Sequence, residues 1–204
     1  MNVATGYQMT NTGTVAIEEG STIALAGGTY TQSAGSTTVT GSLSASEVTV
    51  NGGTLSAEGD GSLGSVSKVT VNTGGTLLLG VSTPANDRIG DTTEVELGGG
   101  TFETGGFSET VGALTLTADS TLDLGAGTSY LTFDGASSFG SSVLTILNWS
   151  GTVGSTGGTD RLLFTNSSFV EGTTNGQIVF DIGGTRYDAE FRPLTETPWK
   201  RLRL

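Results

Sequence analysis

The chain has 204 residues with no cysteine and no histidine, which excludes a disulfide framework, a thiolate nucleophile and a zinc site of the Cys/His kind. Its net charge of −12, from 8 basic and 20 acidic residues, disfavours binding to nucleic acid and to anionic membranes. The 34 glycines and only 3 prolines, with abundant Thr, Ser and Val, indicate short strands joined at tight corners.

After a weakly patterned segment, residues 1–20, which we expect to be a partial rung or a cap, one phrase recurs five times. The phrase is Val-x-Val-x-Gly-Gly-Thr-Leu, and its copies are IALAGGTY from Ile23, VTVNGGTL from Val48, VTVNTGGTL from Val69, VELGGGTF from Val95 and LDLGAGTSYL from Leu122. The copies start 21 to 27 residues apart. Each alternates apolar and polar residues, breaks at glycines and resumes, which predicts strand, corner, strand.

A unit this short cannot bury an apolar face alone, so successive units must stack around one core. The sequence therefore predicts an all-β solenoid over residues 21–170, in a chain of about seven to nine rungs. Val48, Val69 and Val95 should face inward in neighbouring rungs.

Between and after the repeats, several segments differ from the phrase. Gly80–Asp91, with Pro84 and charged residues, and the Ser/Gly-rich Ala136–Ser142 are expected to loop out of the stack. We expect strands at Val143–Ser150 and Arg161–Phe164, with a turn at Gly151–Gly158 between them.

The end of the chain, residues 171–204, predicts a capping hairpin and a basic tail. Two alternating runs in Gln177–Phe191 lie on either side of Gly183-Gly184, which is a strong hairpin signal. Exposed strand edges and core ends promote aggregation, so we expect this hairpin to cover the last rung. Trp149 should pack near this cap.

Much of the chain resembles the autotransporter-associated β-strand repeat proteins, a family of Gram-negative surface proteins of which many carry a PEP-CTERM sorting tail. The resemblance rests on VTVNTGGTLLLG, NDRIGD, VELGGGTFETGGFSETVGALTLTADSTLDLG and LTILNWSG, between Val69 and Asp160, and on residues 27–59. It implies a right-handed parallel β-helix exported to the cell surface or matrix, and it implies no reaction. After Pro193 the chain reads LTETPWKRLRL, which departs from the Pro-Glu-Pro motif and apolar helix of a sorting tail.

Two groups of acids invite a calcium interpretation, because calcium takes six to eight oxygen ligands. They are Asp91, Glu94 and Glu96, and the pair Glu58 and Asp60. Neither group matches a calcium-binding repeat or an EF-hand loop, so a solvated surface is the favoured interpretation.

Asp119, Asp123 and Asp134 could resemble the paired carboxylates of polysaccharide hydrolases. Asp123 lies inside the repeat, where outward polar residues alternate with the core, so a polar face explains it better. The bases Lys68, Arg88 and Arg161 are too few and too scattered for lyase chemistry. We therefore predict no enzyme, no catalytic, cofactor-binding or metal-binding residues, and no cofactor.

Two further patterns remain. Tyr30, Phe102, Phe107, Tyr130 and Phe133 recur near corners and are expected in the core rather than on a glycan-binding platform. Thr-x-Thr arrays bind ice on some solenoids. The arrays at residues 37–40 and 114–117 do not recur at one rung position, so we do not expect ice binding.

The predicted function is that of a non-enzymatic structural or adhesive protein, secreted or on the cell surface, with no signal peptide and no sorting tail visible in this chain. The alternatives are a carbohydrate-binding module and a filament subunit that joins end to end. Self-association through the solenoid ends and surface glycans are the partners left open. We expect no nucleic acid partner, and we expect no membrane span because no stretch reaches about 18 apolar residues.

Overall fold

The computed structural model describes residues 6, 8–80, 87–151, 158–166, 176–193 and 200–203. These residues form an all-β, right-handed parallel β-helix of about six turns, which confirms the predicted fold class. The number of turns is smaller than the seven to nine expected, because the last three strands pair only in antiparallel fashion, at one end of the stack, and do not add turns.

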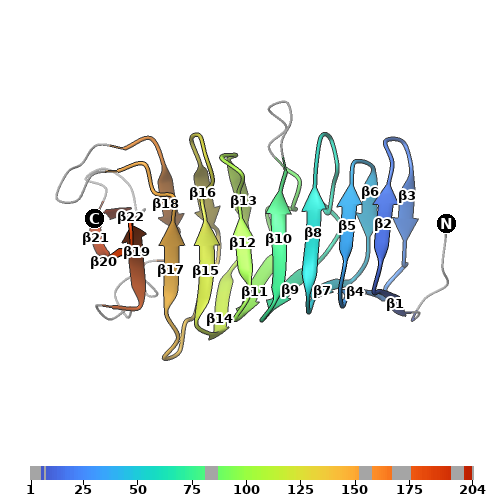
Figure 1. Ribbon diagram of the computed structural model, residues 1–204, viewed down its shortest axis with the longest axis horizontal. Coiled ribbons are helices and arrows are strands. Elements are labelled where there is room, and N and C mark those ends of the chain that lie inside the picture. The colour runs from blue at the N-terminus through green and yellow to red at the C-terminus, as the bar shows by residue number, and fades with distance from the viewer. Residues whose placement is uncertain are drawn as a thin grey trace.

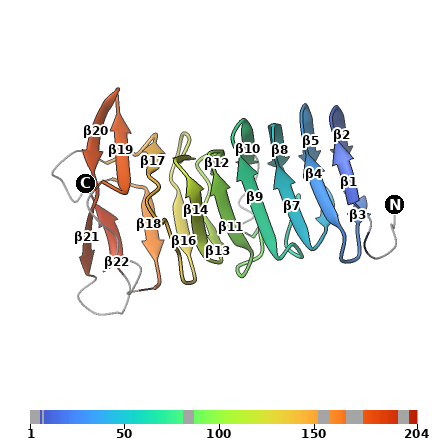
Figure 2. The same cartoon turned by 90° about the horizontal axis from the view of Figure 1, so that it is seen from below.

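Stacked strands form three sides of an elongated body (Figure 1 and Figure 2). The first sheet contains β1 (Gln8–Asn11), β4 (Thr29–Gln32), β7 (Glu47–Val50), β9 (Lys68–Asn72), β11 (Glu94–Gly98) and β14 (Leu114–Ala118). The second sheet contains β2 (Thr14–Ile17), β5 (Ser36–Val39), β8 (Gly53–Ala57), β10 (Gly75–Leu79), β12 (Thr101–Glu103), β15 (Ser120–Asp123), β17 (Leu144–Leu147), β19 (Ile178–Ile182) and β20 (Thr185–Asp188).

The third side is less regular than the other two. It begins with β3 (Thr22–Ala24) and β6 (Ser42–Ser44) and continues through isolated bridges from Ser42 to Ser62 and from Leu63 to Ile89. It ends in a five-stranded sheet made of β13 (Glu109–Val111), β16 (Tyr130–Phe133), β18 (Arg161–Phe164), β22 (Lys200–Arg203) and β21 (Glu190–Pro193).

Inward-facing apolar residues stack in columns to form one continuous core. Val48 pairs with Val69, and Val69 pairs with Val95, and all three are fully buried. This confirms their predicted place in neighbouring turns. One corner later, Leu55, Leu77 and Phe102 form the next buried column. The alternation in each repeat therefore places one apolar residue per pleat in the core.

The recurrent phrase occupies all three corners of the solenoid. The copies from Val48, Val69 and Val95 join the first sheet to the second, whereas the copy from Ile23 joins β3 to β4 and the copy from Leu122 joins β15 to β16. Each corner needs residues with positive φ and close backbone packing between turns. Gly53, for example, has φ +72°, and a Cβ atom there would overlap the carbonyl oxygen of Gly35.

The first turn of the solenoid includes part of the N-terminal segment. Residues 8–17 lie in the segment predicted to be a partial rung or cap, and they form β1 and β2, which pair in parallel with β4 and β5.

Two segments that were predicted to loop out of the stack contain residues that belong to it. In Gly80–Asp91, residues 81–86 lie outside the described part, but Arg88 and Ile89 are buried and Ile89 bridges Leu63.

In Ala136–Ser142, Ser138 bridges Thr115 and Phe139 is buried against Phe164, so this segment also belongs to the stack. Its Ser/Gly composition is typical of a loop, but backbone hydrogen bonds between Ser138 and β14 and the buried Phe139 ring join it to the stack. The predicted turn at Gly151–Gly158 lies mostly outside the described residues.

The predicted C-terminal hairpin is confirmed. β19 adds to the second sheet beside β17, and β20 folds back on β19 after Gly183-Gly184. The Phe180 ring contacts the Trp149 ring at a centroid distance of 4.9 Å, so the hairpin packs against the end of the core. The basic tail forms a second antiparallel pair, β21 and β22, with β22 paired to β18, and the sequence did not indicate this pair.

Candidate functional site

A column of hydroxyl side chains runs along the outer face of the second sheet. The stacked residues, each in register with the next, are Thr14, Ser36, Thr54, Thr76, Thr101, Thr121 and Thr145. Thr14 is exposed and the others are half-buried. The Thr-x-Thr arrays at residues 37–40 and 114–117 lie on different sheets, along β5 and β14, as expected, but single hydroxyl residues do recur at one position of successive turns. Thr54, Thr76 and Thr101 follow the Gly-Gly pair of the recurrent phrase, whereas the other members of the column follow different residues. These differences and the unequal insertions between repeats hide the periodicity in the sequence.

A second hydroxyl column lies on the outer face of the first sheet. In each turn, one corner separates it from the column on the second sheet. It contains Thr10, Thr31, Thr49, Thr70 and Thr115, with Glu96 interrupting it. These two columns together are called the hydroxyl ridge. Asn72 Nδ2 donates to Asn51 Oδ1 at 2.7 Å on the corner between the columns, so the corner is polar as well.

The ridge is not a regular Thr-x-Thr array. The second outward column of the second sheet contains Ala16, Thr38, Ser56, Leu78, Glu103, Asp123 and Leu147. Its side chains differ in size and charge from turn to turn. Glu103 faces Asp123, and partial burial, followed by this neighbouring carboxylate, raises the pKa of Glu103.

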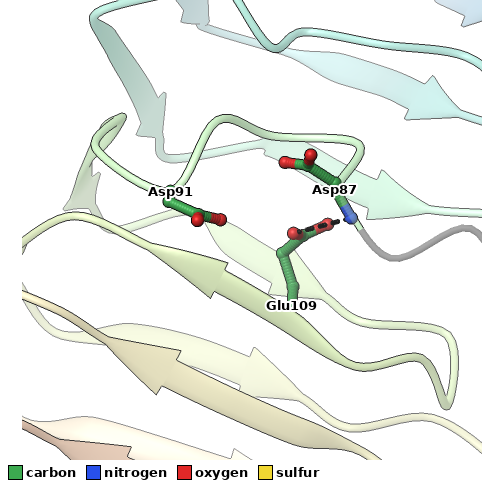
Figure 3. A group of neighbouring side chains, drawn as sticks. All are labelled: Asp87, Asp91 and Glu109. Atoms are coloured by element: carbon green, nitrogen blue, oxygen red, sulfur yellow. Dashed lines mark hydrogen bonds between the residues drawn. The ribbon is translucent and has the colours of Figure 1, made fainter.

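Three carboxylates converge on the third side, at the segment that precedes β11 (Figure 3). Oxygens of Asp87, Asp91 and Glu109 lie within 4.8 Å of one another. Glu109 is buried, and its carboxylate accepts backbone N–H groups of Asp87 at 3.1 Å and Arg88 at 3.0 Å. Burial raises the pKa of Glu109 to about 7, against the lowering effect of these hydrogen bonds. Both oxygens of Glu109 thus accept backbone hydrogen bonds, which join the segment Asp87–Arg88 to β13.

The structure separates the acids that the sequence groups together. Asp91 joins Asp87 and Glu109, whereas Glu96 accepts a 2.7 Å hydrogen bond from Lys68 Nζ on the neighbouring strand. This hydrogen bond raises the pKa of Lys68. Glu109 was not a candidate in the sequence, because ETV matches no motif and its partner segment lies one turn away.

Glu58 and Asp60 are the other pair of acids considered for calcium. They belong to a corner turn in which Gly61 N–H donates to the Glu58 carbonyl at 2.8 Å. Asp60 is exposed and Glu58 is half-buried. Glu58 and Asp60 are therefore neighbours because they belong to the same turn.

The hydrolase candidates lie at three different corners of one turn. Asp119 Oδ1 accepts Val143 N–H at 2.8 Å, Asp123 Oδ1 accepts Asn148 Nδ2 at 2.6 Å, and Asp134 Oδ1 accepts the Thr165 hydroxyl at 2.7 Å. Each aspartate therefore binds a group of the following turn. This arrangement separates the carboxylates and gives them a structural role between turns.

The basic residues considered for lyase chemistry are equally dispersed. Lys68 binds Glu96 on the first sheet, and Arg88 is buried with its guanidinium 4.7 Å from the Phe107 ring centroid. Arg161 Nη1 donates to the carbonyl of Asp160 at 2.6 Å, at the start of β18. The three side chains therefore do not share a site with one another.

Most of the corner aromatic residues belong to the core. Tyr30, Phe102 and Phe133 are fully buried, as predicted, and Phe107 is half-buried. Tyr130 differs, with 48% of its surface exposed and the Arg161 guanidinium 5.9 Å from its ring centroid. An aromatic ladder for sugar rings is therefore not formed by these five residues.

An open groove of about 470 Å³ lies beside the first sheet. Glu47, Lys68 and Glu94 line it from three neighbouring strands, together with the corner residues Gly64–Ser67 and Thr92. Its lining is polar and charged, which suits hydrated side chains rather than an apolar ligand.

Comparison of the chain with protein-family models, curated proteins and solved structures found no match. The resemblance to autotransporter-associated β-strand repeat proteins therefore stays a prediction. Among the described residues there is no helix of sufficient length and apolarity to cross a membrane.

Proposed function

We propose that this chain is a non-enzymatic structural or adhesive protein of a bacterial surface or extracellular matrix. The observation that carries the proposal is the hydroxyl ridge, which repeats the same small polar group along successive turns. Neighbouring strands lie about 4.8 Å apart, so seven stacked hydroxyls extend over roughly 30 Å. Such a surface offers many equivalent weak hydrogen bonds to a polymer that itself repeats hydroxyl groups, and weak contacts add when they are linked.

The continuous core supports the structural part of the proposal. Apolar columns run from Ile17 in the first turn to Phe180 at the C-terminal cap, so each turn is held by its neighbours. The acids best suited to catalysis instead form contacts between turns. The surface location and the bacterial origin rest on the family resemblance.

The experiment compares two isosteric double variants. Thr76→Val with Thr101→Val removes two adjacent hydroxyls of the ridge, and Thr110→Val with Thr132→Val removes two adjacent hydroxyls of the third side. Valine keeps the shape and the strand preference of threonine. We expect wild-type protein and the third-side variant to be retained on insoluble cellulose or chitin, and the ridge variant to be retained several-fold less.

Equal retention of the two variants, or no retention of wild-type protein on neutral polysaccharides or bacterial cells, would contradict adhesion through the ridge. Binding to a glycan array distinguishes the carbohydrate-binding module from a general adhesive surface. A single strongly preferred glycan supports a module, whereas weak binding to many glycans supports an adhesive surface.

A second candidate function is end-to-end assembly, and partly exposed apolar residues at the N-terminal end of the solenoid favour it. Met9, Val15 and Ile23 occupy inward positions of the first turn, one on each side, and they are only partly buried. In the described part of the chain, β1, β2 and β3 are edge strands. Unpaired edges beside apolar residues promote association. Sedimentation velocity should then show association that rises with concentration and is reduced by Val15→Lys, and a monomer at all concentrations would contradict this candidate.

A further inference from the structure

An exposed aromatic side chain lies beside an arginine on the third side of the solenoid. Tyr130 on β16 and Arg161 on β18 are partners in register, and the Arg161 guanidinium carbon lies 5.9 Å from the centroid of the Tyr130 ring. Tyr130 is 48% exposed, and within the described ranges no other large apolar side chain is exposed. The ring and the half-buried guanidinium therefore form one surface that is partly open to solvent.

The Arg161 guanidinium is held through one of its nitrogens. Nη1 donates to the carbonyls of Gly158 at 2.5 Å and Asp160 at 2.6 Å. In the described part of the chain, no carboxylate forms an ion pair with Arg161, and the ion pair found there joins Lys68 to Glu96. The edge of the guanidinium formed by Nε and Nη2 is therefore left to bind a ligand, and two parallel donors on one edge suit a bidentate contact with a carboxylate.

One buried carboxylate fixes the backbone beneath both side chains. Asp160 is 1% exposed, and its two oxygens accept the N–H groups of Ser129 at 2.8 Å and Ser150 at 2.7 Å. Ser129 directly precedes Tyr130, and its carbonyl accepts the N–H of Arg161 at 2.7 Å. The aromatic ring and the guanidinium are thus attached to backbone that is already ordered, which lowers the entropy cost of binding.

The C-terminal part of the chain differs in charge from the rest. Residues 1–160 contain 15 acidic and 2 basic residues, whereas residues 161–204 contain 5 acidic and 6 basic residues. β22, which pairs with β18, places Arg201 opposite Leu163, two residues after Arg161. Because exposed charges more than about 8–10 Å apart are largely screened at physiological salt, an anionic group can approach this end of the third side despite the net charge of −12.

We propose that Tyr130 and Arg161 form a binding subsite for a carboxylated sugar, in which a uronic acid residue packs its ring on Tyr130 and pairs its carboxylate with Arg161. The aromatic face packs against the C–H groups of the sugar ring, and the planar guanidinium matches the carboxylate. Thr132, two residues after Tyr130, and its partner Thr110 add half-buried hydroxyls on the same outer face.

A peptide fits this surface less well than a polysaccharide. β16 lies between β13 and β18, and β18 lies between β16 and β22, so neither strand has an open edge for pairing with a peptide backbone. The subsite lies on a different side from the hydroxyl ridge and selects charged sugars. It therefore goes beyond the adhesive function proposed above and does not depend on it.

Calorimetric titration with oligogalacturonate tests the subsite. Wild-type protein should bind the oligomer, and Tyr130→Ala and Arg161→Gln should each weaken binding by about tenfold or more. The same oligomer with methyl-esterified carboxylates keeps the sugar rings and loses the charge, so wild-type protein should bind it at least about tenfold more weakly. Arg186→Gln removes an exposed arginine of β20, changes the net charge equally and should bind as wild type.

Two further variants separate the possible causes of a loss. Arg161→Lys keeps the charge without the planar guanidinium and should bind more weakly than wild type. Thr76→Val with Thr101→Val should bind oligogalacturonate as wild type, so a failure of the ridge is distinguishable from a failure of the subsite. Absence of binding by wild type, equal binding of the esterified oligomer, an equal loss in Arg186→Gln, or tighter binding of poly-glutamate than of oligogalacturonate would overturn the proposal.

Discussion

Individual charged side chains link neighbouring turns of this solenoid. Lys68 Nζ binds Glu96 across two strands of the first sheet, and Glu47 and Glu94 are its in-register neighbours on either side. Lys68 therefore lies among three carboxylates in a body that is strongly acidic. Its positive charge relieves their mutual repulsion.

Replacing Lys68 by methionine should lower the free energy of unfolding by about 1 kcal/mol or less, because the ion pair is partly exposed and screened by solvent. The loss should be largest at low salt and should shrink at high salt. Urea denaturation at two salt concentrations measures both effects. Lys68→Arg keeps the charge and serves as the control, and a loss for Lys68→Met that does not depend on salt would indicate lost packing instead.

Glu109 gives the stability of the protein a pH dependence. Because burial raises the pKa of Glu109 from 4.5 to about 7, the folded state binds this proton more tightly than the unfolded state. The stabilisation is fully present below about pH 4.5 and is lost as the pH rises through about 7, an effect of up to about 3 kcal/mol.

Urea unfolding of wild type and Glu109→Gln across this pH range isolates the contribution. The stability of wild type relative to the variant should decrease from pH 5 to pH 8. A constant difference between the two proteins would show that Glu109 has the same pKa in the folded and unfolded states.

At the scale of the elements, the hairpin packs on the end of the core through an aromatic contact with Trp149, a residue that follows β17. Phe180 is fully buried on β19 and packs edge-on against Trp149. Phe180→Ala should lower the free energy of unfolding by about 3–5 kcal/mol, because it removes a buried ring at the end of the core.

Tyr130→Ala is the matched control for this substitution, since the Tyr130 side chain is about half exposed, and it should cost much less. Thermal or urea denaturation of both variants gives the comparison. Equal losses for Phe180→Ala and Tyr130→Ala would show that the hairpin does not seal the core.

The sequence predicted elements wherever the pattern is local. Alternating runs around Gly183-Gly184 identified the hairpin, and the recurrent phrase identified the inward Val48, Val69 and Val95. Features that depend on contacts between turns could not be predicted in this way. The bridge of Ile89 to Leu63 and the pairing of β22 with β18 involve residues far apart in sequence, with no periodicity to relate them.

The same limit explains the candidate sites. Asp91 and Glu109 are 18 residues apart, and their proximity follows from the length of one turn and the path of one corner. The hydroxyl column was missed because insertions between the repeats vary their spacing, whereas the strands themselves stay in register.

For the whole molecule, register between turns determines both the core and the outer faces. A shift of one residue in a strand would exchange its inward and outward side chains. The apolar columns and the hydroxyl ridge are therefore two consequences of one alignment, and the ridge exists only if the strands of successive turns stay in register.

Engineered disulfides test this alignment most directly, because the natural chain has no cysteine. Thr54→Cys with Thr76→Cys places two thiols on neighbouring strands, about 4.8 Å apart, which is within the reach of a disulfide. Thr54→Cys with Thr101→Cys places them two strands apart, at about 10 Å, beyond that reach. Under mild oxidation, mass spectrometry should find an intramolecular disulfide in the first pair and free thiols in the second. A disulfide in the second pair, or none in the first, would contradict the stacked hydroxyl column.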